Sequence, residues 1–461
     1  MKSAKAYRMK RESAWLVGLL AMVVAGCESG SPSDGEDGSG AAAPSSSVTY
    51  YKDVAPILNR SCVDCHRAGE IGGFALDTFE TAHESASLAA AYVESGLMPP
   101  FYATETAECD PPGGWVDDPR LTDEEIATLR AWADAEAPAG DPADAVEVEP
   151  IKPPELDRVD LEMARSEPSL ISGDGDQFHC VTFDPMVSEP TWISGIHLNL
   201  DNPKIAHHAI TSLVAREDAE AENGEYVDCF GGNEGVMVHA WVPGGRPFDL
   251  PPEIGILVQP GDVFVVQMHY HPTLDTEESD ASSLQLRFSD SVPDYQLYVQ
   301  LRGNANNAEQ GLLPGPNDSG GPQFFVPANE SGHTEEMTAK AQTMGQELPI
   351  FFVAGHMHLV GRDIKITRQR DGNDQCLLQI SNWDFSWQLF YQFDAPISEL
   401  PTIKQGDTLN MRCTYDNTKQ NAHLAEGLAG EGLSAPIDVS LGEETLDEMC
   451  IAALGVLLPV N

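Results

Sequence analysis

The segment VFVVQMHY at positions 263–270 decides the fold class of most of this chain. It consists largely of β-branched and aromatic residues, and a Pro-Gly turn signal stands before it at 260–261. The segment YQLYVQL at 295–301 has the same character. Short strands separated by turn residues are typical of β-sandwiches. We therefore expect two all-β, jelly-roll-like sandwich domains, at 158–290 and 291–461.

A different pattern precedes the predicted strands. The segment YKDVAPIL at 51–58 has apolar residues at helical spacing, and residues 80–95 are rich in Ala and Glu. Thr122 and Glu125 have the spacing of a capping box at the start of a further helix. These features predict a small all-α domain at 50–138.

Two other stretches are predicted to lack regular structure. Residues 139–157 are mostly Pro, Ala, Asp and Glu, and they predict an interdomain linker. Residues 303–345 are polar and rich in Gly and Asn, so we expect a long surface excursion there.

The N-terminus has the pattern of an export signal. Basic residues precede an apolar run at 14–24, which is shorter than the roughly 20 residues of a membrane span. The run ends in the sequence VAGC, which resembles a bacterial lipobox and predicts lipidation of Cys27 after removal of the residues before it. Ordinary signal cleavage near Ala25 is the alternative. Residues 28–49 then form a tether, and the protein is expected in the bacterial cell envelope, periplasmic or outer-membrane associated, anchored to the membrane by lipid.

The charge of the chain excludes one class of partner. It carries 73 acidic and 26 basic side chains, for a net charge of −47. Such a chain repels phosphate backbones, so we expect no nucleic-acid partner.

A haem attachment motif lies in the predicted helical domain. Cys62-Val63-Asp64-Cys65-His66 has the C-x-x-C-H pattern, in which two thiols reach one porphyrin and the adjacent histidine binds the iron. A chance zinc site or disulfide is the alternative reading. Met98 is the expected sixth ligand, with an ordinary core methionine as the competing interpretation. Such Met/His ligation favours electron transfer. We therefore expect one covalent haem c in a cytochrome c-like domain.

Three histidine clusters lie in the predicted β region, at 207–208, 269–271 and 356–358. Alternate residues of a strand share a face, so His356 and His358 can bind one metal ion from a single strand. Imidazole ligands suit copper or zinc, and a thioether in the set favours copper. The clusters therefore predict metal binding.

The histidine clusters lie in motifs whose order along the chain resembles that of a known family. The segments AHHAI (206–210), VQMHY (266–270), HMHLVGR (356–362) and DEMC (447–450) resemble the ordered motifs of the copper type II, ascorbate-dependent monooxygenases. The segment NWDFSWQ (382–388) is similar to an aromatic Asp-Phe segment of the same family. The resemblance extends over roughly 170–455.

The resemblance implies two mononuclear copper sites. His207, His208 and His269 would hold an electron-transfer copper, while His356, His358 and Met449 would hold the copper that activates oxygen. His271 is the second choice for the third ligand of the first site. Adjacent residues of a strand point to opposite faces, so binding through both His207 and His208 requires a bend or unequal use of ring nitrogens.

The resemblance also implies disulfides. Cys413 is expected to pair with Cys450, next to Met449, and Cys180 with Cys229. A further family disulfide of the first domain is absent, because Val214 stands where a cysteine is expected. Cys109 and Cys376 have no assigned partners and can pair with each other or stay reduced.

The resulting functional hypothesis is a copper-dependent monooxygenase that uses O2 to hydroxylate an activated C–H bond of a small molecule. The fused haem, supplied by an external electron donor, would provide electrons. Ala354 replaces the arginine of peptide-amidating relatives, and residues 451–453 lack their asparagine and tyrosine, so we expect a different, apolar substrate. The alternatives are a non-catalytic haem and copper electron-transfer or copper-handling envelope lipoprotein, and a zinc-bound interaction module.

Overall fold

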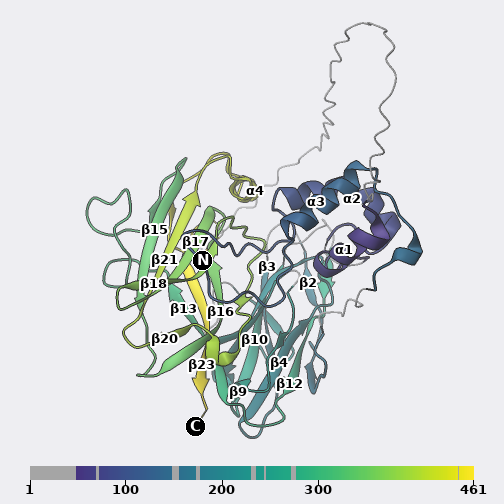
Figure 1. Ribbon diagram of the computed structural model, residues 1–461. Helices are drawn as coiled ribbons and strands as arrows, with labels where there is room; N and C mark the ends of the chain where they lie inside the picture. Colours follow the sequence, from purple (N-terminus) through teal and green to yellow (C-terminus); the bar gives the residue numbers. More distant parts are fainter. Residues whose placement is uncertain are drawn as a thin grey trace, which may run out of the picture. The chain divides into compact units, whose positions relative to one another are not determined.

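A computed structural model of the chain is shown in Figure 1. The structure describes residues 48–68, 72–147, 155–172, 177–229, 235–242, 245–270, 277–444 and 446–460. The signal segment, Cys27, most of the tether and His271 lie outside the described residues, so the expectations for them stay predictions. Within the described ranges, no helix has both the length and the apolar character that a membrane span requires.

Helices occupy the region that follows the tether. A short π-helical turn (η1, Tyr50–Val54) leads into α1 (Ala55–Ser61), and α2 (Phe79–Glu94) and α3 (Asp123–Asp134) follow. Thr122 caps α3, and its hydroxyl and the Glu125 carboxylate form the capping box that the sequence predicts. A separate hydrophobic cluster that includes Leu58, Leu129 and Trp132 holds these helices together.

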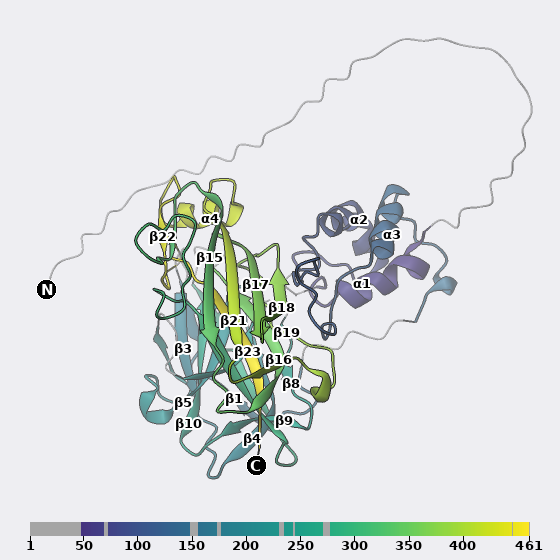
Figure 2. The same cartoon turned by 60° about the vertical axis from the view of Figure 1, so that its left-hand side comes forward.

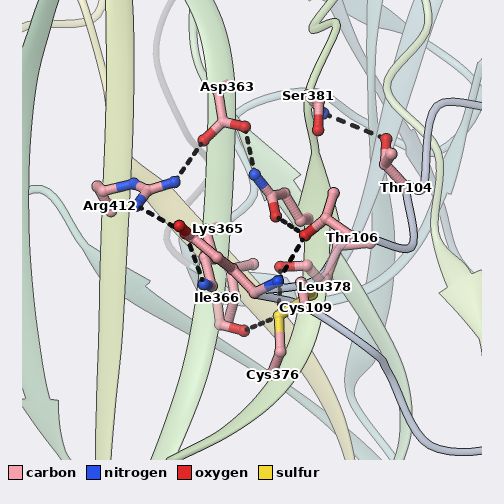
Figure 3. Close-up of a disulfide and its surroundings, with 12 residues drawn as sticks. Thr104, Thr106, Cys109, Asp363, Lys365, Ile366, Cys376, Leu378, Ser381 and Arg412 are labelled. Atoms are coloured by element: carbon pink, nitrogen blue, oxygen red, sulfur yellow. Dashed lines mark hydrogen bonds and ion pairs between the residues drawn. A yellow bond between two sulfur atoms is a disulfide. The ribbon is translucent and has the colours of Figure 1, made fainter.

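The chain between α2 and α3 departs from the expected run of short helices. Residues 101–116 have no helix and instead lie against the β region, where Ala103 forms a β-bridge with Ile380 and Trp115 forms one with Phe393. A disulfide joins Cys109 of this segment to Cys376 (Figure 3). Burial of Trp115 and Tyr102 in the main core explains why this stretch is extended.

The rest of the described chain is mostly β structure, as expected. The largest sheet has ten strands within the described residues: β1 (Leu161–Met163), β12 (Ser283–Phe288), β4 (Thr191–Asn199), β9 (Ile254–Val258), β13 (Tyr295–Gly303), β23 (Ile451–Pro459), β16 (Glu347–His356) and β19 (Tyr391–Gln392) in spatial order, with β8 (Phe248–Asp249) beside β4 and β20 (Thr402–Lys404) beside β16.

Two further sheets complete the sandwich layers. One contains β6 (Tyr226–Asp228), β3 (Gln177–Phe183), β10 (Asp262–Tyr270), β5 (Ala206–Ala215) and β7 (Val236–Trp241). The other, visible as neighbouring strands in Figure 2, contains β15 (Ser331–Lys340), β21 (Thr408–Asp416), β17 (Gly361–Arg370) and β18 (Asn373–Ile380).

Short elements connect these layers. Two strand pairs are β2 (Ser169–Ile171) with β11 (Glu278–Asp280) and β14 (Phe325–Val326) with β22 (Val439–Ser440). The remaining helical pieces are η2 (Pro142–Asp144), η3 (Arg216–Asp218), η4 (Ile397–Glu399) and α4 (Ala422–Gly430).

The ten-stranded sheet continues across the position where two β domains were expected to meet. β9 and β13 pair in parallel, with Tyr295 opposite Ile254 and Gln296 opposite Gly255. One hydrophobic cluster contains core residues from both halves, such as Phe264 and Leu454. The two halves of the β region are therefore linked by backbone hydrogen bonds as well as by side-chain packing.

The expected surface excursion at 303–345 contains a long strand, and that expectation is wrong for residues 331–340. β15 pairs with β21, and its buried residues alternate as His333, Glu335 and Met337. Glu335 accepts a hydrogen bond from the His333 ring, with Oε1 2.9 Å from Nε2, so two polar residues satisfy each other inside the sandwich. Buried polar pairs of this kind obscure the alternation that hydrophobicity alone would reveal.

Candidate metal centres

The first histidine cluster forms where β5 and β10 pair irregularly. His269 lies opposite His208, but the next residue, Tyr270, lies opposite Ala206. His207 is therefore an extra residue in β5, which is the definition of a β-bulge. A bulge changes the direction of a side chain, and here it brings two consecutive histidines to the same site. Of the two possibilities that the sequence left open, a bend or unequal use of ring nitrogens, the structure has a bend in the strand at this point.

Three imidazoles converge at this bulge. The Nδ1 atoms of His207 and His208 are 3.1 Å apart, and those of His208 and His269 are 3.4 Å apart. One ring nitrogen from each residue lies within 4.8 Å of the others. Metal–imidazole bonds of about 2.0–2.1 Å place neighbouring ligand nitrogens about 3 Å apart, so the cluster has the dimensions of a three-histidine metal site.

A buried polar triad lies directly behind the first cluster. The Tyr270 hydroxyl donates to Asp280 Oδ2 at 2.7 Å, and Arg165 lies 2.9 Å from the same carboxylate oxygen. The Arg165 and Asp280 side chains are 2% and 0% exposed, respectively. Because Tyr270 follows His269, this ion pair fixes the end of the strand that carries the third histidine.

The second histidine pair lies at the end of β16. The strand ends at His356, and His358 belongs to the loop that follows, so the two residues do not share one strand face as expected. Their rings nevertheless approach, with centroids 5.1 Å apart. Burial and the neighbouring His358 lower the pKa of His356 to about 3, and burial lowers that of His358. Both rings are therefore neutral at physiological pH, which is the form that binds metals.

Each ring of this pair is oriented by an oxygen atom. His356 Nδ1 lies 2.6 Å from Gln388 Oε1, and His358 Nδ1 lies 3.0 Å from the carbonyl oxygen of Asp447. An Nδ1–H that donates to such an acceptor leaves Nε2 with a free lone pair. Both rings are thus arranged to present Nε2 to a metal ion.

Backbone pairing and backbone hydrogen bonds place Met449 near this histidine pair. His356 is the register partner of Ile451 in the pairing of β16 with β23, two residues after Met449. Glu448 accepts hydrogen bonds from the backbone N–H groups of His358 and Met449. Burial raises the pKa of Glu448 to about 8, although these hydrogen bonds lower it. One carboxyl group therefore holds together the two loops that carry His358 and Met449.

The haem attachment motif forms a tight turn after α1. The N–H of His66 donates to the carbonyl of Cys62 at 2.9 Å, and His66 Nδ1 lies 3.1 Å from the Phe74 carbonyl oxygen. Burial lowers the pKa of His66, so its ring is neutral and its Nε2 is the nitrogen left for a metal. Cys62 and Met98 both pack against the hydrophobic cluster of the helices. One expected attachment cysteine and the expected sixth ligand thus pack against the same small core.

Three disulfides are present among the described residues. Cys180 pairs with Cys229, and Cys413 pairs with Cys450. The second bridge ties β21 to the residue after Met449. The third bridge, Cys109–Cys376, resolves the open assignment of these two cysteines in favour of mutual pairing.

Comparison with known proteins agrees with the copper chemistry of this region. Residues 319–432 match the family described as copper type II ascorbate-dependent monooxygenase, C-terminal domain. DBH-like monooxygenase protein 1 of Homo sapiens is 30% identical over 228 residues, which are 48% of this chain and 32% of that protein. Dopamine beta-hydroxylase of Rattus norvegicus is 27% identical over 225 residues, which are 47% of this chain and 31% of that protein. The chain thus spans about a third of the length of these relatives.

These matches are to copper type II monooxygenases and support that class of protein. The relatives match about half of the chain, and the family model matches residues 319–432, which do not include the haem motif. Among solved structures, allantoicase aligns at a TM-score of 0.16 and 12% identity, over 49% of this chain and 74% of that chain, too weakly to bear on fold or function.

The groups that orient the second histidine pair could not be named from the sequence alone. Gln388 lies at the end of the quoted NWDFSWQ segment, and Asp447 and Glu448 lie in the quoted DEMC segment. The orienting residues therefore lie in the quoted motifs, but only the folded chain shows which of their atoms contact the two rings.

Proposed function

We propose that this chain is a copper-dependent monooxygenase that uses O2 to hydroxylate an activated C–H bond of a small-molecule substrate. The observation that carries the proposal is the convergence of His207, His208 and His269 on one point, with Nδ1 atoms 3.1 and 3.4 Å apart. The second pair, His356 and His358, supports it because both rings are neutral and each is oriented by an oxygen atom.

The residues divide into two sites of different character. His207, His208 and His269 would hold an electron-transfer copper, and His356, His358 and Met449 would hold the copper that meets O2. Bound copper would supply one-electron redox chemistry and oxygen activation. The thioether of Met449 favours the reduced ion, which reacts with oxygen. Gln388 and the Asp447 carbonyl would keep Nε2 of both histidines directed at the metal.

The helical region would supply electrons. In this proposal Cys62 and Cys65 attach a haem c, His66 and Met98 bind its iron, and an external donor reduces it. The backbone supports such a role, because the segment after Met98 is fastened to the β region. The Tyr102 N–H lies 3.3 Å from the Tyr391 hydroxyl on β19, and Phe101 packs edge-on against the Tyr391 ring at 5.0 Å. β19 pairs with β16, the strand that ends at His356.

The substrate is proposed to be apolar. Ala354 lies two residues before His356 and is 7% exposed, and Ala452 and Ala453 on the paired strand β23 are also buried. None of these side chains can pair with a carboxylate. The export signal and Cys27 further suggest a lipid-anchored protein of the bacterial cell envelope.

Metal analysis tests the proposal first. The chain without residues 1–27 is expressed in a periplasm that attaches haem c, and iron, copper and the EPR spectrum of the oxidised protein are measured. We expect about one haem and two type II coppers, with one copper lost in His207→Ala and one in His356→Ala. Zinc in place of copper, or haem alone, would contradict the proposal.

Measurement of oxygen uptake distinguishes a monooxygenase from a non-catalytic electron-transfer or copper-handling protein. A monooxygenase consumes O2 when an apolar substrate is added, and Met449→Ala abolishes that consumption. A protein with both coppers and the haem that consumes no O2 with any substrate would be a non-catalytic electron-transfer or copper-handling lipoprotein.

A further inference from the structure

One phenyl ring touches both histidine clusters. The Phe385 ring stacks on His207 at a centroid distance of 5.7 Å and an interplanar angle of 29°. The same ring meets His358 edge-on at 5.9 Å and 77°. His207 belongs to the five-stranded sheet, whereas His358 follows a strand of the ten-stranded sheet. Phe385 therefore connects two clusters that no single sheet carries.

The loop that carries Phe385 is anchored at the second cluster. Trp383, which is 2% exposed, donates its indole N–H to the His358 carbonyl at 3.2 Å. Gln388 Oε1 lies 2.6 Å from His356 Nδ1, and its amide nitrogen donates to the Phe385 carbonyl at 3.0 Å. These contacts attach both ends of the 383–388 loop to the metal-binding histidines. The loop thus holds the phenyl ring in a defined place relative to the second cluster.

The ring is apolar and lies between two groups of polar rings. An aromatic side chain has two torsion angles, so a ring that stacks on His207 and meets His358 edge-on has little freedom to move aside. Water cannot occupy the volume that the ring fills. The ring consequently occupies part of the space between His207 and His358.

We propose that Phe385 is a positioning residue that fixes the separation of the two metal sites and the path between them. This inference rests on the proposed function, because it requires copper at both clusters. In that setting an electron passing from the first site to the second would cross one aromatic ring. A substrate would have to approach the second site beside Phe385, so the ring would also limit the room at the oxygen-activating metal.

The separation of two paramagnetic ions can be measured without turnover. Two nearby Cu(II) ions broaden each other's EPR lines by a dipolar coupling that falls with the cube of their distance. The spectrum of the fully loaded wild-type protein is compared with the sum of the spectra of His207→Ala and His356→Ala, each of which holds one copper. The excess broadening reports the separation of the sites.

The variants remove or retain the ring. Phe385→Ala should keep two coppers per chain and change the excess broadening, whereas Phe385→Tyr, which retains the ring, should behave like the wild type. Phe390→Ala is the matched control, since Phe390 belongs to the same connection and packs on Phe352 and Phe248 at 5.0 and 5.9 Å. We also expect substrate-dependent O2 uptake to fall on the order of 10- to 100-fold in Phe385→Ala alone, as for other losses of positioning.

The outcomes are distinct. Broadening in Phe385→Ala that equals the wild type overturns this inference and leaves the proposed function intact. A wild-type protein without two coppers overturns the proposed function and this inference with it. If Phe385→Ala loses copper, Phe385→Val, which keeps a branched side chain but removes the ring and much of its volume, is tested instead, and excess broadening equal to that of the wild type there overturns the inference as well.

Discussion

His208 and His269 face each other across β5 and β10, with their Nδ1 atoms 3.4 Å apart. The register changes at the next position, where Tyr270 pairs with Ala206 and His207 becomes the extra residue of a bulge. Two neighbouring histidines of one strand can therefore serve one metal ion, which a regular strand would forbid.

Each histidine of the bulge should be required for the first copper. His207→Ala, His208→Ala and His269→Ala are each expected to lower the copper content by about one ion per chain, because a three-ligand site loses a third of its donors. His271→Ala is the control, and it should keep both ions. Loss of copper in His271→Ala, with retention in His269→Ala, would assign the third ligand to His271 instead.

Gln388 should tune the affinity of the second site. Gln388→Leu removes the acceptor that orients the His356 ring, and loss of such a partner typically lowers metal affinity about 10- to 100-fold. The measurement is a copper titration against a competing chelator. Gln392→Leu on the neighbouring strand is the control. Equal affinities in both variants would show that the ring is oriented by other contacts.

The buried ion pair behind the first cluster should govern stability. Asp280→Asn leaves the 2% exposed Arg165 without its carboxylate partner, and breaking a buried pair in this way costs about 3–5 kcal/mol of the free energy of unfolding. Urea denaturation measures the change. Asp290→Asn removes a carboxylate that is 86% exposed in its pair with Arg158, so its stability should stay close to that of the wild type. Equal losses in both variants would contradict the prediction.

The Cys109–Cys376 bridge should fasten the segment that follows the haem motif. Around it, Thr106 donates to the Gln379 side chain at 3.1 Å, and Thr104 accepts from the Ser381 N–H at 3.4 Å (Figure 3). The double variant Cys109→Ala/Cys376→Ala is expected to lose about 2–4 kcal/mol of unfolding free energy.

The same double variant tests the proposed electron supply. Stopped-flow oxidation of the reduced haem by the copper sites should slow in this variant, while iron and copper contents stay the same. An unchanged rate would show that electrons reach copper independently of this connection.

His333 should make a contribution to the free energy of unfolding that depends on pH. Burial lowers the pKa of His333, but hydrogen bonds and charge from Glu335 and Glu330 outweigh it, so the folded pKa lies above the ordinary value. A raised histidine pKa contributes stability that is complete below the unfolded value of about 6.5 and is lost as pH rises through the folded value.

Comparison with a neutral variant isolates this term. The difference in unfolding free energy between the wild type and His333→Gln should shrink as the pH rises above about 6.5, measured by urea denaturation. The stability of His333→Gln is subtracted from that of the wild type because other histidines also change stability with pH. Burial lowers the pKa of several of them, such as His356, so their contribution to the free energy of unfolding is lost as the pH falls. A difference that is constant over this range would contradict the assignment.

Local sequence was enough to predict part of the secondary structure. The Thr122–Glu125 capping box and the strand at 263–270 are formed, because capping and strand preference depend on residues close together in the chain. The polar strand β15 escaped prediction, since its burial depends on Glu335 meeting His333 inside the sandwich.

The sequence by itself determined the β-rich class and the histidine clusters, which follow from residue type and spacing, and its resemblance to a known family implied the pairs Cys180–Cys229 and Cys413–Cys450. Only the tertiary structure decided that His207 sits in a bulge, that Gln388 orients His356 and that Phe385 lies between His207 and His358. It also paired Cys109 with Cys376, 267 residues away. These contacts depend on strand register and on the packing of separate sheets, which long-range pairing sets and which no local pattern of residues encodes.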